Sequence, residues 1–187
     1  IYAKFQQQRD HAFKVLCSHM TKAGIKPDQL TYLSILMLIP LVFFLNSNPL
    51  FAVLCLFVSV GLDSLDGCLA RYQNIASERG ALLDIAADHL VLFTTLLALI
   101  YVKTIDGFWG AAYGMNYLLM IVLILVMRKL KLHVFTVIKS KYVFYFLWAF
   151  FIFTGLNYLD IFLVFFSIYM LLTNLFLFHK YRCSVPL

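Results

Sequence analysis

The chain has 187 residues and a formal net charge of +6, with 63% hydrophobic and only 13% charged residues. Its mean hydropathy of +0.89 excludes an ordinary water-soluble domain, because the apolar stretches are too long and too numerous for a soluble core. An all-α membrane protein that crosses the bilayer several times is therefore predicted, and no nucleic-acid partner is expected.

Residues 1–26 differ from the rest of the chain because apolar and basic side chains are mixed along them. They lack the apolar core of a cleaved signal, so we expect an N-terminal amphipathic helix that lies in the membrane interface. A plain soluble cap is the alternative. The side chains that favour the interfacial helix are Phe5, Phe13, Val15, Leu16 and Met20, together with Lys4, Arg9, Lys14 and Lys22.

Six later stretches are apolar enough to span a bilayer as helices, which takes roughly 20 residues each. Short breaks with turn-forming residues separate them, so neighbouring spans are expected to run antiparallel. No internal repeat or low-complexity linker divides the chain, which predicts one domain over residues 1–187 with a six-helix bundle over residues 27–180. The predicted spans cover residues 31–46, 49–70, 81–102, 107–127, 142–157 and 159–178.

The lysine and arginine residues predict the orientation of this bundle. With six spans, all of them except Lys103 fall on the face that carries both termini. Basic residues concentrate on the cytoplasmic side of membrane proteins. We therefore expect an integral protein of the plasma or inner membrane, with both termini and the active site on the cytoplasmic face.

Four aspartates lie within two of the predicted spans, in the stretch DSLDGCLARYQNIASERGALLDIAAD. An ionisable group at membrane depth is costly unless it is paired, hydrated or bound to metal, so these residues indicate a site. Counted from the cytoplasmic ends of the two helices, Asp66 and Asp84 lie roughly 6–7 Å deep and Asp63 and Asp88 roughly 12 Å deep. Spacings of three and four residues put each pair on one helix face. Two opposed helices would gather all four carboxylates.

Such a cluster predicts bound divalent cations, because neighbouring carboxylates cannot all stay ionised without a counter-charge. Oxygen ligands without histidine or cysteine in register favour two ions of Mg²⁺ or Mn²⁺, which together can clamp a diphosphate. Gly67 would let the diphosphate ligand approach the backbone, and Gly80 would serve close packing or the turn. The Arg71 guanidinium can donate to a phosphate or hold a carboxylate.

The stretch resembles the signature of the CDP-alcohol phosphotransferase family, which reads DxxDG, two residues, AR, eight residues and GxxxDxxxD. The chain meets every fixed position of that signature: Asp63, Asp66, Gly67, Ala70, Arg71, Gly80, Asp84 and Asp88. The family also commonly has proline, asparagine, two residues and threonine at the start of its first span. Here these positions are Pro27, Asp28 and Thr31, so Asp28 departs from the pattern.

The resemblance implies a phosphatidyl transfer that releases CMP. Asp63, Asp66, Asp84 and Asp88 would bind two divalent ions, and Asp88 would be the base that takes the proton from the attacking alcohol. The alcohol would attack the β-phosphorus of a CDP-linked lipid, for which CDP-diacylglycerol is the expected donor, and the enzyme would be a homodimer. The resemblance further implies a nucleotide-binding set made of Thr31, Asp63, Gly67, Ala70, Arg71 and Gly80.

The acceptor is expected to be a small polar alcohol, and three basic residues between the fourth and fifth spans are candidates for binding it. Arg128, Lys139 and Lys141 would suit an acceptor that carries phosphate, of the glycerol 3-phosphate or inositol phosphate type. Alternatively, these residues serve topology or contact anionic membrane lipids.

Two other functions use intramembrane aspartates. A prenyltransferase that acts on allylic diphosphates resembles longer chains with two widely separated aspartate motifs, whereas this chain has one block. A cation transporter would need polar residues in several other spans, and those spans are nearly free of them in the sequence.

Overall fold

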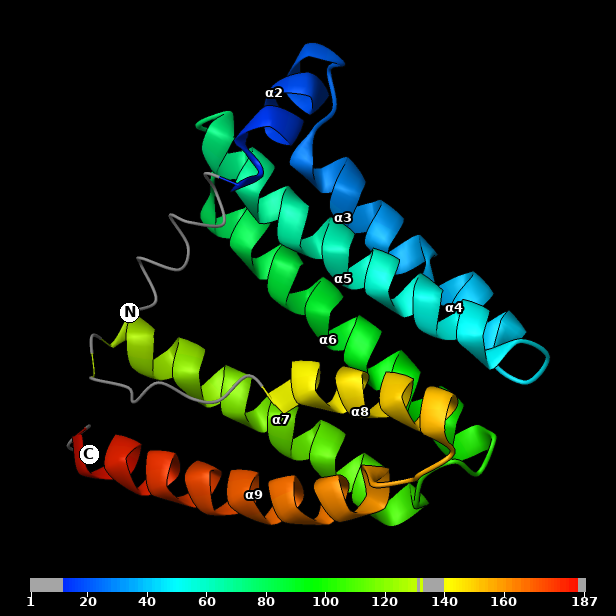
Figure 1. Cartoon of the computed structure of the whole chain (residues 1–187). Coiled ribbons are helices and arrows are strands. Elements are labelled where there is room, and N and C mark those ends of the chain that lie inside the picture. Colours follow the sequence, from blue (N-terminus) through cyan, green and yellow to red (C-terminus); the bar gives the residue numbers. More distant parts are fainter. Residues whose placement is uncertain (1–11, 131, 133–139, 185–187) are drawn as a thin grey trace. The chain divides into compact units, whose positions relative to one another are not determined.

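The computed structural model describes residues 12–130, 132 and 140–184, and within these ranges every regular element is a helix (Figure 1). The chain divides into two compact units, Ile1–Thr94 and Thr95–Leu187. The division falls inside α6 (Glu78–Tyr101). The all-helical class is confirmed for the described residues, whereas the single domain over 1–187 stays a prediction.

Within the described ranges, five helical segments are long and apolar enough to cross a bilayer, which makes the chain an integral membrane protein. A sixth apolar helix, α8 (Ser140–Thr154), has 15 residues and would extend about 22 Å, short of the roughly 30 Å hydrocarbon core. The six-span count therefore stays a prediction. The five segments are Pro27–Phe44, Pro49–Tyr72, Glu78–Tyr101, Gly107–Lys129 and Leu159–Cys183.

The first crossing segment consists of two helices, α3 (Pro27–Leu36) and α4 (Leu38–Phe44). It begins four residues before the expected start, because Pro27 occupies the first helical position, where its missing N–H costs nothing. The Gln29 side chain accepts a hydrogen bond from the backbone N–H of Lys26 at 2.9 Å. The interruption at Met37 follows from Pro40, whose missing N–H leaves the carbonyl of residue 36 without its helical partner.

Helix α5 (Pro49–Tyr72) carries the first two aspartates of the signature. The Asn48 side chain caps it by accepting from the Phe51 N–H at 3.2 Å, and Pro49 again takes the first helical position. Both α3 and α4 pack along α5 (Figure 1). After α5, Asn74 adopts the left-handed conformation with a φ of 58°, which turns the chain toward α6.

The helix α2 (Lys14–Lys22) packs on the end of α5. Cys17 is buried against Leu30, Cys68 and Leu69, and the Gln73 side chain donates to the carbonyl of Ile25 at 2.9 Å. The opposite side of α2 exposes Val15 and Leu16 beside Lys14 and Lys22. This pattern is compatible with the predicted interfacial helix, whose residues 1–11 lie outside the described part of the chain.

The second unit contains the end of α6, α7 (Gly107–Lys129), α8 and α9 (Leu159–Ser184). Helices α7 and α8 both pack against α9 (Figure 1). Asp106 caps α7 by accepting from the Trp109 N–H at 2.9 Å, and the Asp106 N–H donates to Asp160 at 2.8 Å. Aromatic side chains, with Tyr113, Phe144 and Trp148 fully buried, fill the interior.

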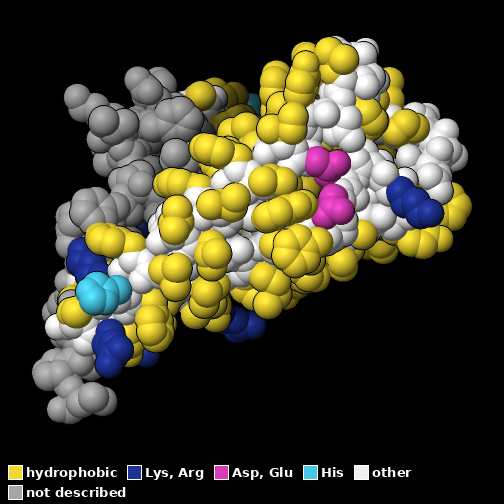
Figure 2. Space-filling model, turned by 90° about the horizontal axis from the view of Figure 1, so that it is seen from below, with side chains coloured by type: hydrophobic (Ala, Val, Ile, Leu, Met, Phe, Trp, Pro, Cys, Tyr) yellow, Lys and Arg dark blue, Asp and Glu magenta, His cyan; other side chains and the backbone are white. Residues whose placement is uncertain are grey.

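Large apolar side chains are also exposed along the spans, as a lipid environment requires. Figure 2 shows one face of the molecule on which hydrophobic side chains predominate.

Candidate metal and nucleotide site

Three of the four predicted aspartates converge in the first unit. Asp63 and Asp66 lie on one face of α5, and Asp84 lies in the second turn of α6. Each offers a carboxylate oxygen, and these oxygens all lie within 4.8 Å of one another. Asp63 and Asp66 are buried, whereas Asp84 is half-buried. The predicted convergence of acidic groups is therefore confirmed for these three residues.

Asp88 lies one helical turn after Asp84 and is half-buried. It is not a member of the group of three. Its assignment as a metal ligand and as the catalytic base thus stays a prediction.

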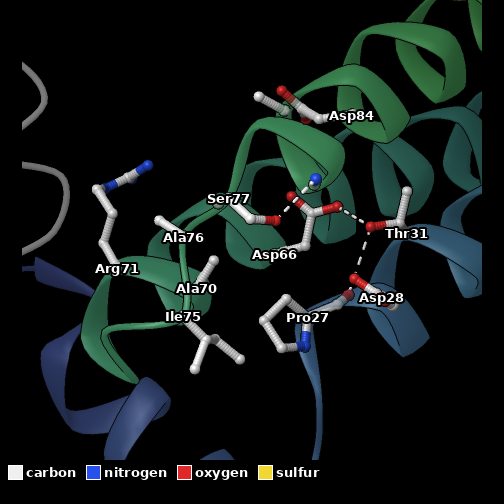
Figure 3. A pocket seen from close by; sticks show the side chains of 13 residues that line it. Pro27, Asp28, Thr31, Asp66, Ala70, Arg71, Ile75, Ala76, Ser77 and Asp84 are labelled. Atoms are coloured by element: carbon white, nitrogen blue, oxygen red, sulfur yellow. Dashed lines mark hydrogen bonds between the residues drawn. The ribbon is translucent and has the colours of Figure 1, made fainter.

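The two oxygens of Asp66 have different surroundings (Figure 3). Its Oδ2 accepts a hydrogen bond from the Thr31 hydroxyl of α3. Its Oδ1 is buried and has no hydrogen-bond partner among the described residues. A buried carboxylate oxygen without a partner is costly, because it has lost its water and gained nothing in return. A cation would satisfy it, so this donor set fits a hard divalent ion.

A pocket of about 180 Å³ opens beside the carboxylates (Figure 3). The start of α3, the end of α5, the connecting turn and the first turns of α6 form its walls. Five of the six predicted nucleotide-binding residues line it, and the sixth, Asp63, belongs to the carboxylate group. The lining residues are Pro27, Asp28, Thr31, Asp66, Gly67, Ala70, Arg71, Ile75, Ala76, Ser77, Gly80, Ala81 and Asp84.

Arg71 lies one turn after Gly67 on α5, and its guanidinium extends over that glycine. A Cβ added to Gly67 would lie 3.4 Å from the Arg71 Nη1, and the Arg71 Nη2 donates to the Cys68 Sγ at 3.6 Å. A side chain at Gly67 would thus be in van der Waals contact with the guanidinium, which lies at the pocket wall. A planar group of donors in this position suits a phosphate.

The start of α6 forms part of the wall of the same pocket, through Ser77, Gly80 and Ala81. The Ser77 hydroxyl accepts from the Gly80 N–H at 3.1 Å and thereby caps the first turn. Helix N-termini favour anions, because their first N–H groups point outward and the helix dipole is positive there. Ser77 is absent from the predicted site residues, although a serine immediately before Glu78 is a recognisable capping signal.

The model of the CDP-alcohol phosphatidyltransferase family matches residues 25–181, which is most of the chain. The chain belongs to this family. Its matched region runs from the residues before α3 into α9 and includes the aspartate signature. No curated protein and no solved structure matches the chain. Family membership makes the chain a membrane-embedded transferase of the class that acts on CDP-alcohols.

The candidate acceptor residues lie in the second unit. Arg128 is exposed in the last turn of α7, and Lys139 lies outside the described residues. The sequence predicts that Lys141 lies in a basic loop between two spans, but the structure places it elsewhere. It lies in the first turn of α8, is 2% exposed, and has its Nζ 4.9 Å from the ring centre of Tyr142. The face of an aromatic ring attracts a cation, so this contact is favourable.

The other spans also contain buried polar groups, although the sequence predicts that they are nearly free of polar residues. Asn174 of α9 donates to the backbone carbonyl of Asn116 of α7 at 2.9 Å. The hydroxyls of Tyr113 and Ser140 lie 2.9 Å apart. These groups bond to one another or to the backbone, as expected of polar residues that hold membrane helices together.

Proposed function

We propose that the chain transfers a phosphatidyl group from CDP-diacylglycerol to the hydroxyl of a small polar alcohol and releases CMP. The observation that carries this proposal is the convergence of Asp63, Asp66 and Asp84 beside a pocket lined by the rest of the family signature. The family match favours this chemistry over prenyl transfer and cation transport.

Asp63, Asp66 and Asp84, with Asp88 one turn beyond, would hold two Mg²⁺ or Mn²⁺ ions. When bound, such ions neutralise a diphosphate and stabilise the charge that develops during displacement at phosphorus. The buried Oδ1 of Asp66 supports this assignment, because it is an acceptor that needs a cationic partner.

The pocket would hold the cytidine diphosphate part of the donor. The Arg71 guanidinium and the N–H groups at the start of α6 would bind phosphate oxygens. The small residues Gly67 and Ala70 would let the nucleotide approach the backbone of α5. Pro27, Thr31 and Gly80 complete the wall. The diacylglycerol chains of the donor would extend into the bilayer around the apolar spans.

Asp88 would act as the general base. It takes the proton from the acceptor hydroxyl while that oxygen forms a bond to the β-phosphorus of the donor. The bond between the β-phosphorus and the bridging oxygen breaks, and CMP leaves with that electron pair. Asp88 lies one turn from Asp84, which would place its carboxylate beside the ion site although it is not one of the group of three.

The site would face the cytoplasm, because the basic residues gather at that end of the spans. Arg128, Lys139 and Lys141 would contribute to binding a phosphate-bearing acceptor such as glycerol 3-phosphate or an inositol phosphate. The protein would act as a homodimer, which chemical cross-linking in native membranes can test.

The test is CMP release by the purified protein in lipid nanodiscs. Each reaction contains CDP-diacylglycerol, Mg²⁺ and one alcohol from a panel of free and phosphorylated alcohols, and a parallel series replaces the donor with a water-soluble CDP-alcohol. We expect CMP with CDP-diacylglycerol and one phosphorylated alcohol, and none with EDTA or in the Asp84→Asn variant. Release of CMP only from the soluble donor would contradict the lipid donor, and no CMP from either donor would contradict the function.

A further inference from the structure

A strip of buried polar side chains runs between α3 and α5 and ends at the carboxylate site. It includes every buried polar side chain in the described part of the first unit. On each helix the spacing is three or four residues, so the strip follows one face of α3 and the facing side of α5. Its members are Thr31, Ser34, Ser59, Asp63 and Asp66.

Hydrogen bonds link this strip from the membrane interior to Asp66. The Ser59 hydroxyl donates across the helix interface to the carbonyl of Ser34 at 2.8 Å. The Ser34 hydroxyl donates to the carbonyl of Thr31 at 2.8 Å. The Thr31 hydroxyl then donates to the Oδ2 of Asp66, with the Pro27 carbonyl a longer 3.4 Å away. Two of these four contacts therefore join α3 to α5.

The hydrogen bond from Ser59 to Ser34 lies close to the break in the first crossing segment. Because Pro40 interrupts the helix at Met37, the part of α3 that reaches the site is only ten residues long. Ser34 lies in its last turn and Thr31 lies one turn nearer the site. The Ser59 hydroxyl thus attaches the short helix to α5 just before the break, and the Thr31 hydroxyl meets Asp66 one turn further on.

The consequence for Asp66 is that one oxygen is occupied and the other is left for a ligand. Thr31 holds Oδ2, which fixes the rotation of the carboxylate, and Oδ1 remains buried without a hydrogen bond among the described residues. Groups that hydrogen-bond metal-binding carboxylates orient them and tune the affinity for the ion.

We propose that Thr31, Ser34 and Ser59 are positioning residues that orient the Asp66 carboxylate for a divalent cation. This inference rests on the proposed function, since it requires an ion at Asp66. It gives Thr31 a different role from nucleotide binding and includes two serines that lie outside the family signature. A purely structural strip would only hold α3 against α5.

The test measures Mn²⁺ binding to the purified protein without any substrate, by electron paramagnetic resonance of the free ion. Thr31→Val keeps the shape of the side chain but removes the hydroxyl, and we expect it to weaken binding about 10–100-fold. Thr31→Ser keeps the hydroxyl and should stay within about threefold of the parent. Ser59→Ala should weaken binding roughly tenfold, the lower end of the same range, because it acts through α3.

Ser64→Ala is the matched control, since Ser64 is half-buried on α5 between Asp63 and Asp66 but outside the strip. It should leave the Mn²⁺ affinity unchanged. Thermal unfolding without metal is measured for every variant, because a structural strip would lower the unfolding temperature and leave the affinity unaltered. If Ser59→Ala fails to fold, the comparison of Thr31→Val with Thr31→Ser decides the question.

The outcomes separate this inference from the proposed function. Parent-like Mn²⁺ affinity in Thr31→Val would overturn the positioning role while the enzyme stays a CMP-releasing transferase. Equal loss in Thr31→Val and Thr31→Ser would also overturn it, because the hydroxyl would then be irrelevant. A parent protein that binds no Mn²⁺ would overturn this inference together with the two-ion mechanism.

Discussion

Replacing Asp66 by asparagine should stabilise the metal-free protein and at the same time remove most of its response to Mg²⁺. Asparagine keeps the shape of the side chain and an oxygen that can accept from Thr31, but it carries no charge. The ligand oxygens of Asp63, Asp66 and Asp84 lie within 4.8 Å of one another. Two unit charges at that distance repel by roughly 3.5 kcal/mol when the effective dielectric constant is about 20.

Solvent at the open side of the pocket reduces this repulsion, so we expect Asp66→Asn to raise the metal-free unfolding free energy by about 1–3 kcal/mol. In a chain of this size each kcal/mol shifts the unfolding temperature by about 2–4 °C. The parent protein should in turn gain about 2.7 kcal/mol when Mg²⁺ is present at a hundred times its Kd. The variant should lose most of that gain, and its CMP release should fall by more than about 100-fold, since a direct ligand matters at least as much as its hydrogen-bond partners.

The assay is differential scanning fluorimetry in detergent, with EDTA and with increasing Mg²⁺, alongside CMP release. Glu78→Gln is the control, because it removes an exposed carboxylate from the first turn of the same α6 that carries Asp84. It should keep the full Mg²⁺ response. An Asp66→Asn protein that is no more stable than the parent in EDTA, and that Mg²⁺ stabilises as much as the parent, would refute the reasoning.

Four further variants or conditions give independent checks. Asp88→Asn should lower kcat by about 10²–10⁴-fold while the Kd for CDP stays near the parent value, as isothermal titration can show, and equal loss of CDP binding would count against its role as base. Removing divalent ions with EDTA should abolish CMP release, and adding Mg²⁺ or Mn²⁺ should restore it; activity that persists in EDTA would exclude the two-ion mechanism. Gln73→Ala removes the side-chain hydrogen bonds to Thr21 and Ile25, so hydrogen exchange should become faster in α2 and stay unchanged in α7; unchanged exchange in α2 would show that these bonds do not hold it. Trp148→Ala empties a fully buried position in α8 and should cost about 3–5 kcal/mol of stability, and a shift below 1 °C in the unfolding temperature would contradict the packing described for the second unit.

The sequence predicts five apolar helical segments and the convergence of three of the four aspartates, for physical reasons that are visible in the residues. Asn48, Pro49 and Asp106 interrupt long apolar runs and thereby predict where the next helices begin. Because helical spacing determines which side chains share a face, Asp63 and Asp66 had to point the same way. The structure then shows Asp84 beside them.

Other features could not be predicted because they depend on packing between helices. Ser34 and Ser59 resemble the small polar residues of any membrane span, and only the alignment of α3 with α5 reveals their hydrogen bond. The burial of Lys141 could not be predicted either, because a lysine at the end of a span is expected to lie in the membrane interface. The break at Met37 did have a signal, because Pro40 cannot complete the helical hydrogen-bond pattern.

The most direct test of the central claim is a crystal structure of the protein with Mn²⁺ and CDP, with anomalous scattering measured at the manganese edge. The account predicts manganese ligated by Asp63, Asp66 and Asp84, with the CDP diphosphate in the adjoining pocket beside Arg71. Manganese bound elsewhere, or CDP in the pocket with no ion at these carboxylates, would contradict it.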